Sequence, residues 1–235
     1  MSEQPVFRAF DPDADVEITV RDLPHWFQPG VTIFVTFRTF DSMPQSVMDL
    51  WHREQIDWLA RRGIATTEHE LREAFAQLID RLPAALQGPF RKIRDHGWHE
   101  KLDAGHGECV LRRPDLAAIV AESIEKFDAD RYDLDSFIVM PNHVHALLQC
   151  RAGWTLRRVA TSWLHYTARR LNQVLGQSGH FWQTEPFDHL VRNGAQFEYL
   201  RRYIRDNPKF AGLQPGEFLY RTHSGTPGPG AVGKA

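Results

Sequence analysis

The sequence has few cysteines and no long apolar run, and each of these absences excludes a class of protein. The two cysteines, Cys109 and Cys150, are too few for a disulfide framework and lack the paired spacing of a structural zinc site. The longest apolar runs, residues 32–37 and 137–140, are far shorter than the roughly 20 residues that cross a bilayer. The N-terminus lacks the basic and apolar segments of a secretory signal. We therefore expect a cytoplasmic protein without a membrane partner.

The chain also lacks an excess of positive charge, since its formal net charge is −2 at pH 7. This value excludes a uniformly basic nucleic-acid-binding surface, but the charge is unevenly divided along the chain. Residues 1–150 hold 16 Lys and Arg against 25 Asp and Glu, a net charge of −9, whereas residues 151–209 hold 10 against 4, a net charge of +6. A polyanion is therefore expected to contact the 151–209 stretch.

The pattern of apolar residues predicts an α+β fold. β-branched and aromatic residues predict a strand at residues 31–39, and two apolar runs separated by Pro141 and Asn142 predict a β-hairpin over residues 132–149. Spacings of three and four predict helices over residues 43–86, 114–127, 155–175 and 195–206. This order fits an antiparallel sheet with helices on one face. We expect a single domain over residues 1–222, with a helical insertion at about 43–106 and a disordered Gly/Pro-rich tail at 223–235.

The segment from Met140 to His145 holds the first candidate site. Successive side chains of a strand alternate between its two faces, so His143 and His145 share one face. Two imidazoles on one face of a strand form half of a divalent-metal site, and a further ligand must come from elsewhere in the chain. A chain with 12 histidines can also hold such a pair by chance, with one ring packed and the other solvated. The pattern alone leaves both interpretations open.

The helix that is predicted to end before Pro208 holds the second candidate site. Tyr203 and Asn207 are four residues apart and so lie on one face of this helix. A tyrosine phenol, whose unperturbed pKa is about 10, needs nearby positive charge or a metal-bound electrophile to act as a nucleophile. Three arginines supply positive charge, namely Arg201, Arg202 and Arg205. Helical spacing is also typical of a core aromatic, and spacing alone assigns Tyr203 to the core.

Together these motifs match a known family. The sequence resembles the single-tyrosine HUH transposases, and specifically the REP-associated tyrosine transposases. The matching stretches lie between about residues 23 and 213 and read Leu-Pro-His-Trp (23–26), Val-Thr-Phe-Arg (35–38), Val-Met-Pro-Asn-His-Val-His (139–145), Gly-His-Phe-Trp-Gln (179–183) and Tyr-Ile-Arg-Asp-Asn-Pro (203–208). The sequence departs from the family in the long helical block after Met43 and at Leu164, where many relatives have a lysine.

The resemblance implies a ferredoxin-like or RRM-like sheet that carries the histidine pair, and a following helix that carries the nucleophile. It assigns His143, His145 and Asn207 to a Mg²⁺ or Mn²⁺ ion, and Tyr203 to attack on phosphorus. The implied product is a 5′-phosphotyrosine on the enzyme and a free 3′-OH, and rejoining needs no ATP because the ester retains the bond energy. The implied activity is therefore nicking and joining of single-stranded DNA by a transposase that acts on hairpins or REP-like repeats.

The implied partner is single-stranded or hairpin DNA, because the sequence shows no zinc finger or heptad repeat for reading a duplex. We expect the DNA backbone to contact arginines of the basic stretch, namely Arg157, Arg158, Arg169, Arg170, Arg201, Arg202 and Arg205. Asp188, His189 and Arg192 fit residues that support the metal ligands, DNA contacts or a solvated loop, so they are left out of the catalytic set. The sequence does not decide between a monomer and a homodimer.

Two other functions stay open from the sequence. A binding protein adopted by the host would use the same fold to bind DNA or RNA without cutting it. A hydrolytic metal nuclease would attack with water, and Tyr203 would then be structural. Two measurements distinguish the transposase from both alternatives. Only the transposase forms a covalent DNA adduct, and only the transposase loses its cutting activity when Tyr203 becomes phenylalanine.

Overall fold

In the computed structural model, which describes residues 7–20 and 24–222, the chain forms two compact units. Residues between Asp41 and Gly107 form one of them, here called the inserted unit. The residues on either side form the other, here called the sheet unit. The expected tail at 223–235 lies outside the described residues. Within those residues, no helix combines the length and the apolar character that a membrane span requires.

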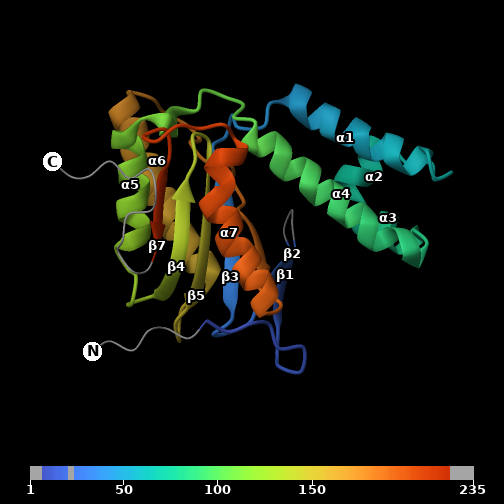
Figure 1. Ribbon diagram of the computed structural model, residues 1–235, viewed down its shortest axis with the longest axis horizontal. Helices are drawn as coiled ribbons and strands as arrows, with labels where there is room; N and C mark the ends of the chain where they lie inside the picture. The colour runs from blue at the N-terminus through green and yellow to red at the C-terminus, as the bar shows by residue number, and fades with distance from the viewer. Residues whose placement is uncertain (1–6, 21–23, 223–235) are drawn as a thin grey trace. The chain divides into compact units, whose positions relative to one another are not determined.

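The sheet unit is built around an antiparallel sheet of five strands in the order β6-β3-β5-β4-β7 (Figure 1). Its elements in chain order are β1 (Glu17–Val20), β2 (Pro24–Phe27), β3 (Thr32–Arg38), the 3-10 turn η1 (Val110–Arg112), α5 (Pro114–Glu125), β4 (Tyr132–Val139), β5 (His143–Cys150), α6 (Leu156–Leu175), β6 (Phe187–Leu190), α7 (Gly194–Phe210) and β7 (Leu219–Thr222). The run β3-α5-β4-β5-α6-β6 is a βαββαβ unit with the ferredoxin-like arrangement. The predicted α+β class is therefore confirmed.

The predicted strand and hairpin form the interior of this sheet. β3 pairs with β5 along its whole length, and β5 pairs with β4 as the other half of the hairpin. The turn between them is closed by the Met140 N–H, which donates to the His143 carbonyl at 2.8 Å. Since β5 is hydrogen-bonded on both sides and fully buried apart from Gln149, its side chains are held in fixed positions.

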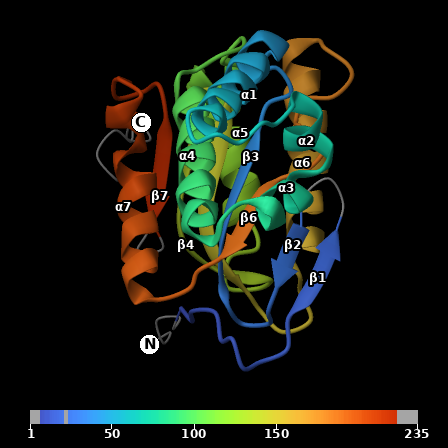
Figure 2. The same cartoon turned by 90° about the vertical axis from the view of Figure 1, so that its right-hand side faces the viewer.

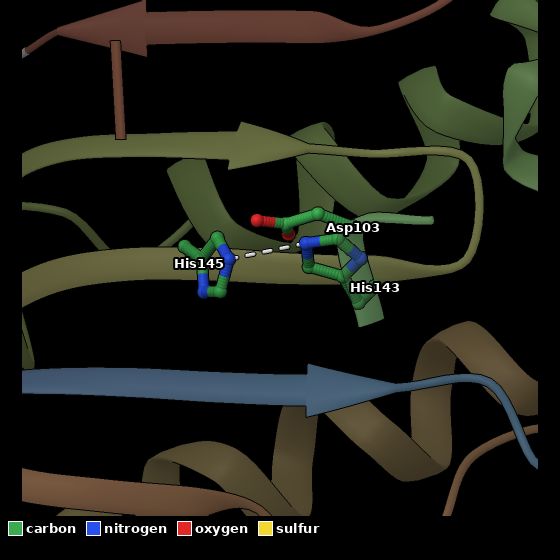
Figure 3. Close-up of side chains that lie close together, drawn as sticks. All are labelled: Asp103, His143 and His145. Atoms are coloured by element: carbon green, nitrogen blue, oxygen red, sulfur yellow. Dashed lines mark hydrogen bonds between the residues drawn. The ribbon is translucent and has the colours of Figure 1, made fainter. Parts of the chain in front are cut away.

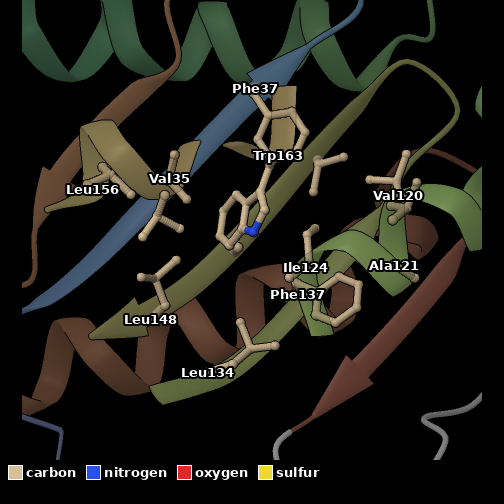
Figure 4. Packing of buried hydrophobic residues seen from close by; sticks show 14 of the residues in the cluster. Val35, Phe37, Val120, Ala121, Ile124, Leu134, Phe137, Leu148, Leu156 and Trp163 are labelled. Carbon is tan, nitrogen blue, oxygen red and sulfur yellow. The ribbon is translucent and has the colours of Figure 1, made fainter. Parts of the chain in front are cut away.

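Helices α5 and α6 cover one face of the sheet and form the main core with it (Figure 4). The Thr155 side chain caps α6 by accepting from the Arg158 N–H, and Gly176 ends the helix in the left-handed conformation at φ 65°. Trp163 of α6 lies in this core and donates from its indole N–H to the Tyr132 hydroxyl at 3.0 Å. These two helices are the predicted one-sided layer.

Helix α7 lies on the opposite face of the sheet and forms a second layer, whereas the sequence predicted helices on one face only (Figure 1). Its apolar stripe packs against the side chains that β3, β4 and β5 turn to that face, because Leu200 and Ile204 are one helical turn apart. The sequence predicted that this helix ends at Asp206, but α7 continues through Pro208 to Phe210. A proline removes only one hydrogen-bond donor near the end of a helix, and packing of the buried Pro208 ring outweighs that loss.

Short strands complete the sheet unit at its edges. β6 and β7 pair with β3 and β4, and β1 and β2 form a separate hairpin whose second strand contacts β6 (Figure 2). His25 on β2 binds both Asp188 and Glu185, the latter at 2.7 Å. The stretch that the sequence left as either a DNA contact or a loop around Asp188 is thus an ordered strand.

The inserted unit is helical, with α1 (Gln45–Ala60), α2 (Glu68–Glu73), α3 (Phe75–Arg81) and α4 (Ala84–Asp103). Its own small core consists of six buried residues: Leu59, Leu71, Leu78, Ile79, Leu82 and Phe90. A capping box formed by Thr67 and Glu70 begins α2. The unit therefore has both local helix signals and a core that belongs to it alone.

Candidate active site

The two histidines of β5 point to the same face of the sheet, as their spacing predicts. Their Nε2 atoms lie 3.1 Å apart, and both side chains are fully buried (Figure 3). Two ligands at a right angle on a metal ion, with bonds of about 2.1 Å, stand about 3.0 Å apart. The histidine pair thus has the spacing of two adjacent ligands on one small divalent cation.

Hydrogen bonds to the other ring nitrogens fix the orientation of both imidazoles. Nδ1 of His143 donates to Oδ1 of Asn142 at 2.8 Å, and Nδ1 of His145 lies 2.7 Å from Oγ1 of Thr36. With its proton on Nδ1, each ring presents the lone pair of Nε2 to the space between the rings. The donor set therefore fits a divalent metal ion.

Tyr203 of α7 lies next to this pair, although it is 58 residues from His145 in the chain. Its hydroxyl oxygen lies 3.5 Å from Nε2 of His145, and the two rings are 5.2 Å apart. Phe34 of β3 supports both, since its ring stacks on His145 at 5.3 Å and meets Tyr203 edge-on at 6.1 Å. Tyr203 and the histidine pair thus meet at one point of the sheet.

Asn207 lies on the same side of α7 as the residues that pack on the sheet. It is fully buried, like Ile204 almost one helical turn before it, whereas Tyr203 is half-buried. Helix α7 contacts both β4 and β5. The amide is therefore held inside the layer between α7 and the sheet.

Two polar residues of β3 belong to this site and were not predicted. Thr36 pairs directly with His145 and Arg38 with His143 in the β3–β5 register, so all four side chains share one face. Burial lowers the pKa of the Arg38 guanidinium to about 10, which leaves it charged at neutral pH. Arg38 could have been identified from the sequence as a charged residue at the end of a strand whose other residues are buried.

The seven predicted DNA-contacting arginines divide into two groups. Those of α6 are exposed on the helix layer opposite the histidine pair: Arg157, Arg158, Arg169 and Arg170. Those of α7 are exposed on the helix that carries Tyr203: Arg201, Arg202 and Arg205. Arg201 also forms ion pairs with Asp135 and Glu198, and Arg205 forms one with Asp206. The structure brings only the α7 group close to the nucleophile.

His189 also lies on the face of the histidine pair. In the β3–β6 register it stands opposite Phe34, and the two rings are 5.2 Å apart. Phe34 therefore separates His189 from His145 in a row of rings across three strands. The sequence could not place this residue, because the four-residue strand β6 has no pattern long enough to identify it.

Comparison with known proteins gives one family match. Residues 110–207 match the model of the family described as "Transposase IS200 like". The predicted resemblance to the tyrosine transposases is confirmed. The segment similar to IS200-like transposases contains both histidines of the pair, Tyr203 and Asn207, and it runs from η1 to the last turn of α7.

One solved structure is similar over a larger part of the chain. It is a REP-associated tyrosine transposase bound to a REP hairpin, with 13% sequence identity and a TM-score of 0.40. The similarity covers 83% of this chain and 76% of that one. No curated protein matches the chain.

Proposed function

We propose that this chain is a metal-dependent tyrosine transposase that nicks and rejoins single-stranded DNA. The observation that carries the proposal is the approach of the Tyr203 hydroxyl to the His143–His145 pair, within 3.5 Å of a ring nitrogen. A nucleophile that attacks a phosphate held by a metal ion requires this arrangement.

His143 and His145 would hold the ion, and Asn207 is the proposed third ligand. A Mg²⁺ or Mn²⁺ ion bound there supplies positive charge to a non-bridging oxygen of the scissile phosphate. Two neutral nitrogens and an amide oxygen leave the charge of the ion undiminished. Such a site favours stabilisation of a charged phosphate over the production of hydroxide, and this distinguishes the proposal from a hydrolytic nuclease.

The chain's own residues supply the nucleophile and its alignment. The Tyr203 oxygen forms a bond to phosphorus while the bond from phosphorus to the 3′ oxygen breaks, and the phenolic proton ends on that released oxygen. The products are a 5′-phosphotyrosine and a free 3′-OH. Phe34 packs against the Tyr203 ring, and Arg38, which pairs with His143 in register, is proposed to bind the phosphate.

The proposed substrate is a single strand or a hairpin, including REP-like repeats. The arginines of α7 are placed to bind the backbone beside the cut. The arginines of α6 are on the other face of the sheet, so they can bind only DNA that extends around the sheet, such as a hairpin stem. We also propose that residues 1–222 act as one transposase domain interrupted by the inserted unit.

The proposal is tested with labelled hairpin oligonucleotides from the repeats that flank the gene. The full chain is incubated with them and Mg²⁺ or Mn²⁺, and a protein–DNA adduct that resists denaturant is sought on gels. Wild type should form the adduct, and Tyr203→Phe should lose both adduct and cutting. His143→Ala with His145→Ala should lose them as well.

Tyr199→Phe is the matched control. Tyr199 is one helical turn before Tyr203, its ring is 58% exposed, and it stacks on Tyr203 at 6.4 Å. This variant should retain the adduct, because its hydroxyl is not the nucleophile. Cutting by Tyr203→Phe would establish the hydrolytic nuclease instead, and binding without any cutting by wild type would establish the adopted binding protein.

A further inference from the structure

Two aromatic rings stand exposed just beyond the end of β3. The ring of Phe40 is 56% exposed and lies against the exposed ring of His180, with centroids 6.0 Å apart and planes 23° apart. Phe40 belongs to neither core cluster of the sheet unit. The two rings thus form an exposed aromatic pair outside the core of the sheet unit.

The backbone beneath these rings is fixed. The Phe40 N–H donates to the Phe181 carbonyl at 2.8 Å, and the Gln183 side-chain amide donates to the Phe40 carbonyl at 2.7 Å. Thr39 forms a β-bridge with Trp182, which is buried. The exposed ring of Phe40 is therefore presented by an ordered main chain, and little entropy is lost when a ligand stacks on it.

Strand β3 leads from the candidate active site to Phe40. Thr36 and Arg38 face the histidine pair, and the chain continues through the bridge between Thr39 and Trp182 to Phe40, which begins the following turn. Two residues of an extended chain span at most about 6.7 Å. Phe40 is therefore within about that distance of Arg38, which pairs with His143 in the sheet register.

We propose that Phe40 and His180 form a stacking site for an unpaired base next to the phosphate that Tyr203 attacks. This inference rests on the proposed function and adds a specific contact to it. Aromatic rings stack on any base, so the site holds a single strand without reading its sequence. A base paired in a duplex has no free face, so the site also favours unpaired DNA over a helix. Arg38, between the rings and the histidines, neutralises the connecting phosphate.

The test compares two fluorescein-labelled probes of equal length, about 15 nucleotides, an oligothymidylate and a fully abasic strand. Fluorescence anisotropy gives the Kd of the full chain for each. Phe40→Ala should weaken binding of the oligothymidylate roughly ten-fold and leave binding of the abasic strand unchanged. Phe40→Trp should restore the wild-type Kd, and His180→Ala should show a smaller loss of the same kind. Phe210→Ala, which removes a 77% exposed phenylalanine from the end of α7, is the control.

Three results would overturn the stacking site. In the first, Phe40→Ala binds the oligothymidylate with the wild-type Kd. In the second, Phe40→Ala binds both probes more weakly by the same factor. In the third, the wild-type protein binds the oligothymidylate no more tightly than the abasic strand. The adduct assay separates the two ideas. An adduct that depends on Tyr203, found together with any of these results, leaves the transposase in place and removes the stacking site.

Discussion

The Thr36 hydroxyl holds the imidazole ring of His145 in its orientation. It lies 2.7 Å from Nδ1 of His145 and is 3% exposed, so no solvent can replace it. When Nδ1 carries the proton and donates it to this hydroxyl, Nε2 of the ring turns its lone pair toward His143. The sequence identified His143 and His145 from their spacing, but Thr36 is 109 residues away from His145, and only the sheet register reveals the contact.

Thr36→Val should weaken Mn²⁺ binding by about 10- to 100-fold, because loss of an orienting partner costs a metal site that much. Isothermal titration of the full chain with Mn²⁺ measures it. Thr32→Val is the matched control, since Thr32 is another fully buried threonine of β3 and its hydroxyl has no partner among the described residues. Equal affinities in the two variants would mean that Thr36 contributes packing only.

Helix α7 is attached to the sheet by an ion pair as well as by its apolar stripe. Arg201 of α7 binds Asp135 of β4 at 3.2 Å, and Ser136 donates to the same carboxylate at 2.9 Å. Burial raises the pKa of Asp135, while Arg201 opposes that rise. A buried carboxylate of this kind depends on its cation to stay charged.

Arg201→Gln should lower the free energy of unfolding by about 1–3 kcal/mol at pH 7, because the buried carboxylate loses its cationic partner. The raised folded-state pKa of Asp135 means that protonation favours the folded state, so the deficit is full above that pKa and shrinks as the pH falls through it. Urea unfolding at pH 7 and near pH 4 measures the difference. Arg202→Gln should change stability by less than about 0.5 kcal/mol at either pH, and an equal deficit for Arg201→Gln at both pH values would contradict the prediction.

Long, regular elements could be predicted from the sequence, and short ones could not. The β4–β5 hairpin has two apolar runs with a turn between them. Helix α6 has a capping residue at each end, and these signals act locally. β6 is a strand because it pairs with β3, and its four residues carry no signal of their own. The same limit explains α7, which continues past Asp206 because burial of Pro208 is a tertiary effect.

In the molecule as a whole, the arginines that are predicted to bind DNA lie on two helices, α6 and α7, which cover opposite faces of one sheet. The sequence located the basic stretch but could not assign its arginines to sides, since α6 and α7 are neighbouring helices in the chain and pack on different faces. A short strand at Tyr203 can reach only the α7 group. A longer hairpin can reach both groups by passing the edge of the sheet.

Substitutions in the two groups should therefore differ with DNA length. Arg202→Ala should weaken binding of a single strand of about 12 nucleotides, whereas Arg169→Ala with Arg170→Ala should weaken binding of a long hairpin only. For a single strand, removing one arginine that neutralises a phosphate should reduce the slope of log Kd against log salt by about 0.7. Anisotropy titrations over a series of salt concentrations measure this slope. An α6 variant that binds the short strand more weakly as well would show that the DNA takes a different path.

Tyr203 and Asn207 occupy consecutive turns of one helix. Under the proposed function, the nucleophile and the metal ligand are therefore lost together when this helix moves away from the sheet. A motion that lifts α7 removes the nucleophile and a metal ligand in the same step. No intermediate position keeps a complete metal site while the tyrosine is absent, so water gains no opportunity to cut the strand in its place. A damaged or loosened copy of the protein is then inert toward the genome, and a nick is made only by a molecule that also retains the means to close it.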